Sequence, residues 1–155
     1  MRIKKYLCHE SIIEELKATT KEAALEELVT ALPREAMGHD RMEMVRVLMA
    51  REKLGSTGIG EGIAIPHGKI AGLDDLMISY GRSKKGLDFN AMDGKPVHLL
   101  FLLMAPENSS GQHLKILARI SRMLKDEIFR KKLMQAVSAD ELYKMIVEKD
   151  DADAE

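Results

Sequence analysis

An imidazole follows a glycine-rich segment of this chain. Residues 55–62 carry glycine at positions 55, 58, 60 and 62, and His67 stands shortly afterwards between Pro66 and Gly68. Glycine adopts positive φ without strain, so successive backbone N–H groups can converge on an anion such as phosphate. A neutral imidazole is a nucleophile near neutral pH and can carry a phosphoryl group covalently. The combination predicts phosphohistidine chemistry at His67, whereas the glycine segment alone would predict only a turn.

The residues before His67 predict how its side chain is presented. If residues 62–66 form a strand, Ile63, Ile65 and His67 share one face. The imidazole would then lie at the end of a strand, which is where α/β sheets build their sites. Pro66 fixes its own φ and Gly68 adds freedom on the other side, so we expect a rigid turn around His67.

Arg51 is the first candidate supporting side chain. It continues the inward stripe of Met44, Val47 and Leu48 on a predicted helix that ends at the glycine segment. An inward arginine needs an anionic partner, and its planar fork suits phosphate oxygens. An ion pair with a carboxylate such as Glu52 or Glu61 fits the spacing equally well.

His113 is the second candidate. It begins the inward face of a helix predicted over residues 111–125, from where it could donate a hydrogen bond to a phosphate or orient His67. A buried histidine that only packs in the core is the alternative. His98 lies within an apolar run, and we expect it to have a structural hydrogen-bond partner.

The motifs of other anion and metal sites are missing. The dinucleotide fingerprint fails because the glycine spacing places Ile63 or Ile65 where its last glycine belongs, and the P-loop fails because Ile70 follows Gly68-Lys69. The chain has no H-E-x-x-H, no H-x-E and no cluster of aspartates. We therefore expect neither a metal nor a nucleotide cofactor.

Composition limits the kinds of binding partner and the cellular compartment that we expect for this protein. The 155 residues carry a net charge of −1 and are 45% hydrophobic, which fits one globular domain and gives no excess positive field for nucleic acid. The longest apolar run, residues 99–105, is too short to span a bilayer, and no export signal is evident. Cys8 is the single cysteine, which fits a reducing, cytoplasmic setting.

Hydrophobic periodicity predicts alternating helices and strands. The expected helices cover residues 20–32, 41–54, 111–125 and 126–136 and the residues from 139 on, with caps at Thr19, Asp40, Ser109 or Ser110, and Ser138. The expected strands cover residues 62–66, 76–81 and 97–104, with turns at Lys85-Gly86 and Asp93-Gly94. This order predicts an α/β domain with helices on both faces of a sheet, over residues 1–149. The acidic residues 150–155 are expected to form a flexible tail.

One long segment closely resembles the signature of the EIIA components of the bacterial phosphoenolpyruvate-dependent phosphotransferase system, of the fructose, mannitol and nitrogen-regulatory type. The resemblance rests on Arg51-Glu52, Gly55-Ser56-Thr57-Gly58-Ile59-Gly60 and Gly62-Ile63-Ala64-Ile65-Pro66-His67-Gly68-Lys69, and it includes Ala105-Pro106 and His113-Leu114. It extends from about residue 20 to about residue 143. The family fold that it implies is a mixed β-sheet between helical layers.

The resemblance implies a role for each candidate residue. His67 matches the phosphorylated histidine, which receives its phosphoryl group, on Nε2, from a small HPr-like carrier protein. Arg51 and His113 match the supporting arginine and second histidine. The phosphate-binding residues that it implies are Ser56, Thr57, Gly58 and Gly60.

The residues of the signature most resemble those of the nitrogen-regulatory branch of the family. Members of that branch regulate target proteins according to their phosphorylation state. Glu61 stands where that branch commonly carries Asn, and we expect it to deepen the negative potential near the phosphate. A fructose- or mannitol-type EIIA that passes phosphate to a sugar-transport EIIB is the alternative within the family. A binding module that holds an anion and transfers nothing is the alternative from another class.

Overall fold

The central element of the fold is β6 (Val97–Pro106), which forms from the long apolar run of the sequence. The computed structural model describes residues 1–154. The other elements, with η for 3₁₀ helices, are η1 (Ile3–Lys5), η2 (His9–Ser11), β1 (Ile12–Ile13), α1 (Lys21–Thr30), η3 (Arg34–Gly38), α2 (Arg41–Lys53), β2 (Gly58–Gly60), β3 (Ile63–Ala64), β4 (His67–Ile70), β5 (Met77–Leu87), α3 (Ser110–Leu124), α4 (Glu127–Gln135) and α5 (Ala139–Asp153).

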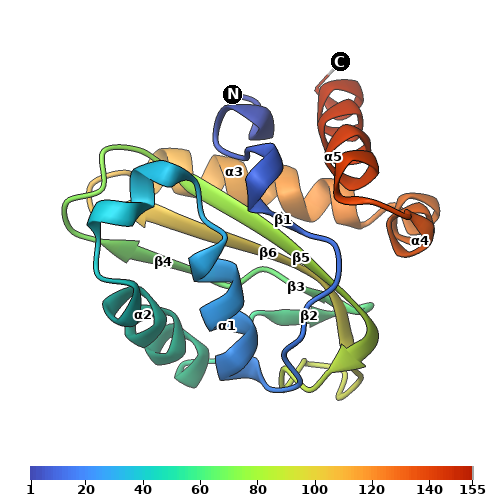
Figure 1. Cartoon of the computed structure of the whole chain (residues 1–155), viewed down its shortest axis with the longest axis horizontal. Coiled ribbons are helices and arrows are strands. Elements are labelled where there is room, and N and C mark those ends of the chain that lie inside the picture. The colour runs from blue at the N-terminus through green and yellow to red at the C-terminus, as the bar shows by residue number, and fades with distance from the viewer. Residues whose placement is uncertain (155) are drawn as a thin grey trace.

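In the described part of the chain, six strands form one mixed sheet in which β6 pairs on both sides (Figure 1). β5 runs antiparallel to β6, while β3 and β4 run parallel to it one after the other. The register places Ile63 opposite Leu99 and His67 opposite Leu103. β1 extends the sheet beside β5, and β2 extends it beside β3.

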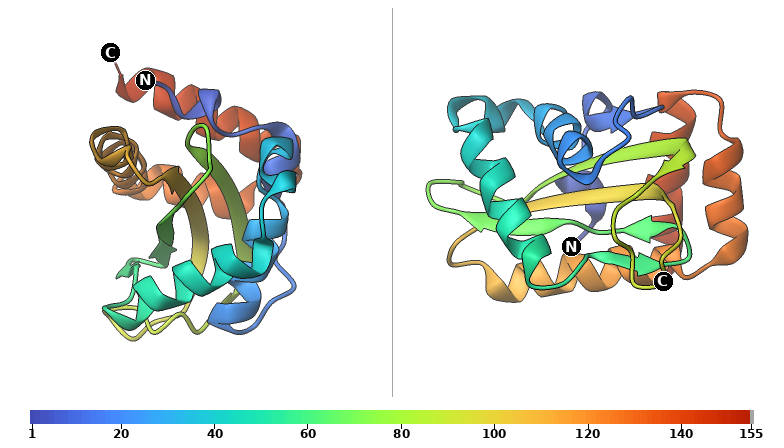
Figure 2. Two further views of the ribbon diagram at one scale, coloured as in Figure 1. Left: turned by 90° about the vertical axis from the view of Figure 1, so that its left-hand side faces the viewer. Right: turned by 90° about the horizontal axis from the view of Figure 1, so that it is seen from below.

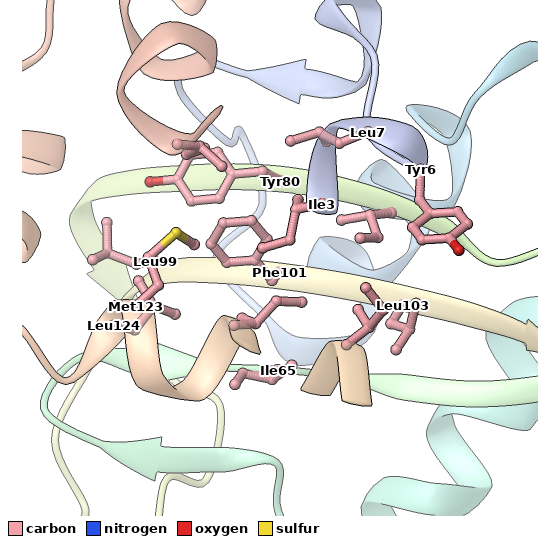
Figure 3. Packing of buried hydrophobic residues seen from close by; sticks show 14 of the residues in the cluster. Ile3, Tyr6, Leu7, Ile65, Tyr80, Leu99, Phe101, Leu103, Met123 and Leu124 are labelled. Carbon is pink, nitrogen blue, oxygen red and sulfur yellow. The ribbon is translucent and has the colours of Figure 1, made fainter. Parts of the chain in front are cut away.

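Helices cover both faces of the sheet, as Figure 2 shows. The side chains of β6 alternate between the two resulting cores. Leu99, Phe101 and Leu103 pack in the core beneath α3, α4, α5 and η1 (Figure 3). Leu100, Leu102 and Met104 pack in the core beneath α1 and α2. The predicted fold, a mixed sheet between helical layers in a single domain, is confirmed.

Side-chain caps start two helices where the sequence predicts them, at Asp40 and Ser138, whereas α1 is capped one residue later than the predicted Thr19. Thr20 Oγ1 accepts the Ala23 N–H, Ser138 Oγ accepts that of Glu141, and the Asp40 carboxylate accepts those of Met42 and Glu43. α3 also differs from the prediction, because Ser109 Oγ donates to the carbonyl of Pro106 and does not cap the helix.

The strand boundaries near His67 differ from the prediction. β3 covers only Ile63–Ala64, because Pro66 has no N–H to give to the ladder. The chain rejoins the sheet as β4, whose first residue is His67, so the predicted turn around His67 is wrong. The turn predicted at Lys85-Gly86 is an irregularity inside β5, where Gly86 has a φ of 83°.

The prediction of a flexible acidic tail from residue 150 is also wrong. α5 continues to Asp153, and Asp150 is only 2% exposed. Its carboxylate accepts the Ile3 N–H at 2.7 Å and pairs with the Arg119 guanidinium at 2.6 Å. A run of acidic residues looks solvated in sequence, but one of its members anchors the first turn of the chain to α3 and α5. Glu155 lies outside the described residues.

We predict that Asp150→Asn lowers the free energy of unfolding by roughly 3 kcal/mol, because it leaves the largely buried Arg119 without a counter-charge. Asp151→Asn is the matched control, because Asp151 is 42% exposed and its ion pairs with Arg2 and Lys4 are long. That change should cost no more than about 1 kcal/mol. Urea unfolding of both variants measures the difference, and equal stabilities would contradict the anchoring role of Asp150.

Candidate functional site

His67 is presented with one ring nitrogen occupied and the other free. Nδ1 lies 2.7 Å from the carbonyl oxygen of Ile65. Because a carbonyl only accepts hydrogen bonds, Nδ1 carries the proton of the neutral ring. The lone pair of the neutral imidazole is therefore on Nε2, so the local fold selects the tautomer in which Nε2 is the nucleophile.

His113 lies beside His67 in the structure. It sits in the first turn of α3 and is 6% exposed. The two rings meet edge to face, with their centroids 5.3 Å apart and an interplanar angle of 85°. β4 and α3 are far apart in the sequence, and their packing against β6 brings the two predicted histidines together.

Burial favours the neutral form of both histidines, because it lowers the pKa of each ring. Burial lowers the pKa of His67 from 6.5, and the nearby Arg51 guanidinium lowers it further, against the opposing effects of the Ile65 hydrogen bond and of Glu52. Burial lowers the pKa of His113 to about 4, with contributions from His67 and Lys69. A neutral ring keeps the lone pair that nucleophilic attack requires.

Two cations accompany the histidine pair. Arg51, at the end of α2, donates one hydrogen bond through Nη1 to the carbonyl of Gly55 at 2.8 Å, and within the described residues it forms no ion pair. A guanidinium has five N–H donors, so donors remain for an anion. Lys69 of β4 donates to the Ser110 hydroxyl at 2.6 Å, at the start of α3. The electrostatic environment of the pair is thus positive.

The glycine-rich segment is stabilised by hydrogen bonds of its own. Ser56 Oγ donates to the Phe89 carbonyl at 2.8 Å and accepts the Gly58 N–H at 3.0 Å. The N–H and hydroxyl of Thr57 both donate to the carboxylate of Glu52, so the structure turns both donors of Thr57 away from an external anion. The predicted phosphate contacts of Ser56, Gly58 and Gly60 stay predictions.

Glu52 is a residue that the sequence analysis missed as part of the site. The spacing predicts only an ion pair between Glu52 and Arg51, but Glu52 is buried and pairs instead with Lys21 of α1, with Nζ 2.9 Å from Oε1. The buried stripe of α2 is Met44, Leu48 and Glu52, a spacing of four residues that could have identified it. Arg51 lies at the margin of that stripe and is partly exposed.

Glu61 lies away from His67, so the expectation that it charges the phosphate site is wrong. It occupies the turn between β2 and β3 with a φ of 60°. Its side chain is 75% exposed and lies 3.5 Å from the Arg130 guanidinium. Ile63 and His67 face Leu99 and Leu103 of β6, so the turn is more than about 13 Å along the sheet from His67 at roughly 3.3 Å per residue.

Outside the site, His98 has a structural partner, and the described residues form neither a metal-binding cluster nor a membrane-spanning helix. His98 Nδ1 lies 2.8 Å from the carbonyl of Ser83, which confirms its structural role. Among residues 1–154, no group of three or more His, Cys, Asp or Glu side chains is placed to hold a metal ion. No described helix is both long enough and apolar enough to cross a membrane.

An α/β domain that holds a neutral, tautomer-selected imidazole beside a second histidine and two cations has the chemistry of a protein that handles an anionic group. Comparison with known proteins agrees. Residues 5–149 match the family described as "Phosphoenolpyruvate-dependent sugar phosphotransferase system, EIIA 2". The chain belongs to this EIIA family.

Relatives from two branches of the family are similar to this chain. A nitrogen regulatory protein from Bradyrhizobium diazoefficiens is 42% identical over 146 residues, which are 94% of this chain and 95% of that protein. The fructose-specific EIIABC component of Bacillus subtilis is 39% identical over 150 residues, 97% of this chain but 24% of that longer protein. The crystal structure of nitrogen regulatory protein IIA-Ntr from Neisseria meningitidis superimposes with a TM-score of 0.85 at 36% identity, covering 92% of this chain and 97% of that one.

The lowered pKa of His113 predicts how the protein responds to acid. In the unfolded chain this ring titrates near 6.5, and in the folded protein near 4. Between these values the unfolded chain binds more protons, so the free energy of unfolding should fall as the pH drops through this window. His113→Gln should make that fall shallower in urea titrations. An NMR titration of His113 with a midpoint near 6.5 would contradict the burial argument.

Proposed function

We propose that the protein is a phosphocarrier that accepts a phosphoryl group on Nε2 of His67 from an HPr-like protein and regulates partner proteins according to its phosphorylation state. The observation that carries the proposal is the hydrogen bond from His67 Nδ1 to the Ile65 carbonyl, which leaves Nε2 as the nucleophile. The proposed activity is that of a transferase with a phosphohistidine intermediate. It would operate in the reducing cytoplasm, which a chain with one free thiol suits.

The proposed transfer step needs no metal or nucleotide from the protein. The Nε2 lone pair of His67 forms a bond to phosphorus as the nitrogen–phosphorus bond of the donor's phosphohistidine breaks, and that bonding pair stays on the donor's nitrogen. Nδ1 keeps its proton and its bond to Ile65 throughout. Arg51 offsets the charge of the phosphoryl oxygens, and the neutral ring of His113 donates an N–H to one of them.

The nitrogen-regulatory relatives support a regulatory output. The nitrogen regulatory proteins from B. diazoefficiens and N. meningitidis match this chain over nearly their whole lengths. Phosphorylation would replace a neutral imidazole by a group that carries about −1.5 to −2 charges. A partner complementary to one form would then discriminate against the other by a coupling of about 1–3 kcal/mol, with no large change of fold.

Sugar transport is the second candidate function. The similarity to the EIIA-containing part of the fructose-specific EIIABC component supports it, because that protein is named for a transported sugar. In this case the phosphoryl group on His67 would pass to a sugar-transport EIIB partner instead of acting as a regulatory mark. The two functions share the acceptor step and differ only in the recipient.

We expect His67 to be required for accepting the phosphoryl group and His113 to be required for passing it on at the normal rate. With phosphoenolpyruvate, the general phosphotransferase and its HPr-like carrier, wild type should gain an acid-labile phosphoryl group, and His67→Ala should stay unlabelled because it lacks the nucleophile. His113→Ala should still be labelled but should pass the group back to the carrier at least about ten-fold more slowly, since it lacks a hydrogen-bond donor to the phosphoryl oxygens.

His98→Ala provides the matched control, because His98 is a partly buried histidine that bonds a backbone carbonyl outside the site. It should be labelled as wild type is. Labelling of His67→Ala, or its transfer to His113, would refute the assignment of the acceptor.

The regulatory output predicts partners that distinguish the two states. Immobilised His67→Ala, fixed in the unphosphorylated state, should retain proteins that phosphorylated wild type releases, or the reverse, because the charge at the site differs. Growth on fructose and on mannitol should be unaffected by deletion of the gene. Loss of growth on either sugar, together with phosphoryl transfer to a sugar-specific EIIB, would replace regulation by transport.

A further inference from the structure

A buried ion pair lies under the glycine-rich segment. Glu52 at the end of α2 and Lys21 at the start of α1 are both largely shielded from solvent, with side chains 3% and 12% exposed. The Lys21 ammonium also lies 4.8 Å from the centre of the Phe89 ring. Because the pair joins the ends of two helices, it fixes the position of the Glu52 carboxylate relative to the sheet.

Hydrogen bonds run without a break from this carboxylate to His67. Glu52 accepts both the N–H and the hydroxyl of Thr57. The carbonyl of Thr57 accepts the Ile65 N–H at 3.1 Å. The carbonyl of Ile65 accepts the Nδ1–H of His67 at 2.7 Å. We call this series of hydrogen bonds the relay. Thr57 and Ile65 each bond the residue nearer Glu52 through one group and the residue nearer His67 through another.

The relay acts where the backbone has few other restraints. Ile65 and Pro66 lie between β3 and β4, outside both strands. The carbonyl of Pro66 accepts the Leu103 N–H of β6 at 3.0 Å, which holds the segment from one side. The bond from Ile65 to Thr57 holds it from the other side, so the direction of the Ile65 carbonyl depends on where Thr57 is held.

We infer that Glu52 and Thr57 are positioning residues for the phosphoryl acceptor: acting through Ile65, they hold His67 in the tautomer and orientation that present Nε2 for attack. The inference rests on the proposed function and adds to it residues that never touch the phosphoryl group. It also accounts for a carboxylate buried close to an anion-handling site, a place where negative charge opposes the chemistry.

The Lys21 ammonium balances the negative charge of Glu52. The groups that face the relay and the His67 ring are Arg51, Glu52, His113 and, through His113, Lys69. Paired with Lys21, the Glu52 carboxylate contributes little net repulsion to an incoming phosphoryl group, while its oxygens stay available to Thr57. A neutral acceptor at position 52 would leave the Lys21 ammonium buried without a partner.

The test compares two substitutions of Thr57. Thr57→Val keeps the shape and the backbone N–H but deletes the hydroxyl bond to Glu52, whereas Thr57→Ser keeps that bond. Thr57→Val should slow phosphoryl transfer from the carrier by about three- to ten-fold, the range that the loss of one hydrogen bond gives. Thr57→Ser should transfer at the wild-type rate. Wild-type transfer by Thr57→Val, or equal impairment of both variants, would overturn the inference.

A second readout needs no phosphoryl donor. In ¹⁵N spectra of the unphosphorylated protein, wild-type His67 should show the Nδ1–H tautomer alone, and Thr57→Val should show added Nε2–H tautomer. Glu52→Gln should lower the pKa of His67, because it leaves the Lys21 ammonium without its counter-charge and so adds net positive charge near the ring. Glu43→Gln is its control, because Glu43 forms an exposed pair with Arg46 on the same helix. An unchanged His67 pKa in Glu52→Gln, or an equal change in the control, would overturn the inference.

These readouts keep the two proposals separable. If wild type takes up no phosphoryl group but Thr57→Val and Glu52→Gln change the His67 tautomer and pKa, the proposed function fails and the positioning role survives. If wild type is labelled and the variants match it in rate and spectrum, the positioning role fails alone. Should Thr57→Val not fold, the His67 tautomer in Glu52→Gln, compared with that in Glu43→Gln, decides the inference: added Nε2–H tautomer in Glu52→Gln alone supports it, and an unchanged tautomer overturns it.

Discussion

The pairing of β6 along its whole length is the constraint on which the rest of the structure depends. Its alternating side chains fill both cores, so neither helical layer could pack without it. The same strand sets the register of β3 and β4 and therefore fixes where the chain resumes after Pro66. His67 stands opposite Leu103 for this reason, with α3 and His113 packed over the same face of the sheet.

The site combines burial with positive charge to keep two imidazoles neutral. Burial is the larger effect at both rings, and Arg51 and Lys69 act in the same direction. Cations that hold a histidine neutral also attract the anionic group that the ring would accept, so one arrangement serves both binding and nucleophilicity. The hydrogen bond from Nδ1 to Ile65 adds direction, because it leaves the lone pair on Nε2.

Much of this could be predicted from local sequence. Capping residues and apolar periodicity define the helices, and the apolar run defines β6, because these signals lie within one turn or one strand. The candidate residues His67, His113 and Arg51 stand out by type and context. What sequence could not give depends on partners distant in the chain: β4 needs β6, and Asp150 is buried only because Ile3 and Arg119 lie beside it. Glu52 had a local signal in its spacing from Met44 and Leu48, but its partners Lys21 and Thr57, which make its burial possible, are visible only in the structure.

The central claim is that the fold selects one nitrogen of one histidine. It is tested most directly by phosphorylating protein labelled with ¹⁵N in its histidine rings and recording which nitrogen is bonded to phosphorus. The account predicts a single phosphorylated ring, that of His67, with phosphorus on Nε2 and the proton still on Nδ1. Phosphorus on Nδ1 of His67, or on His113, would contradict it.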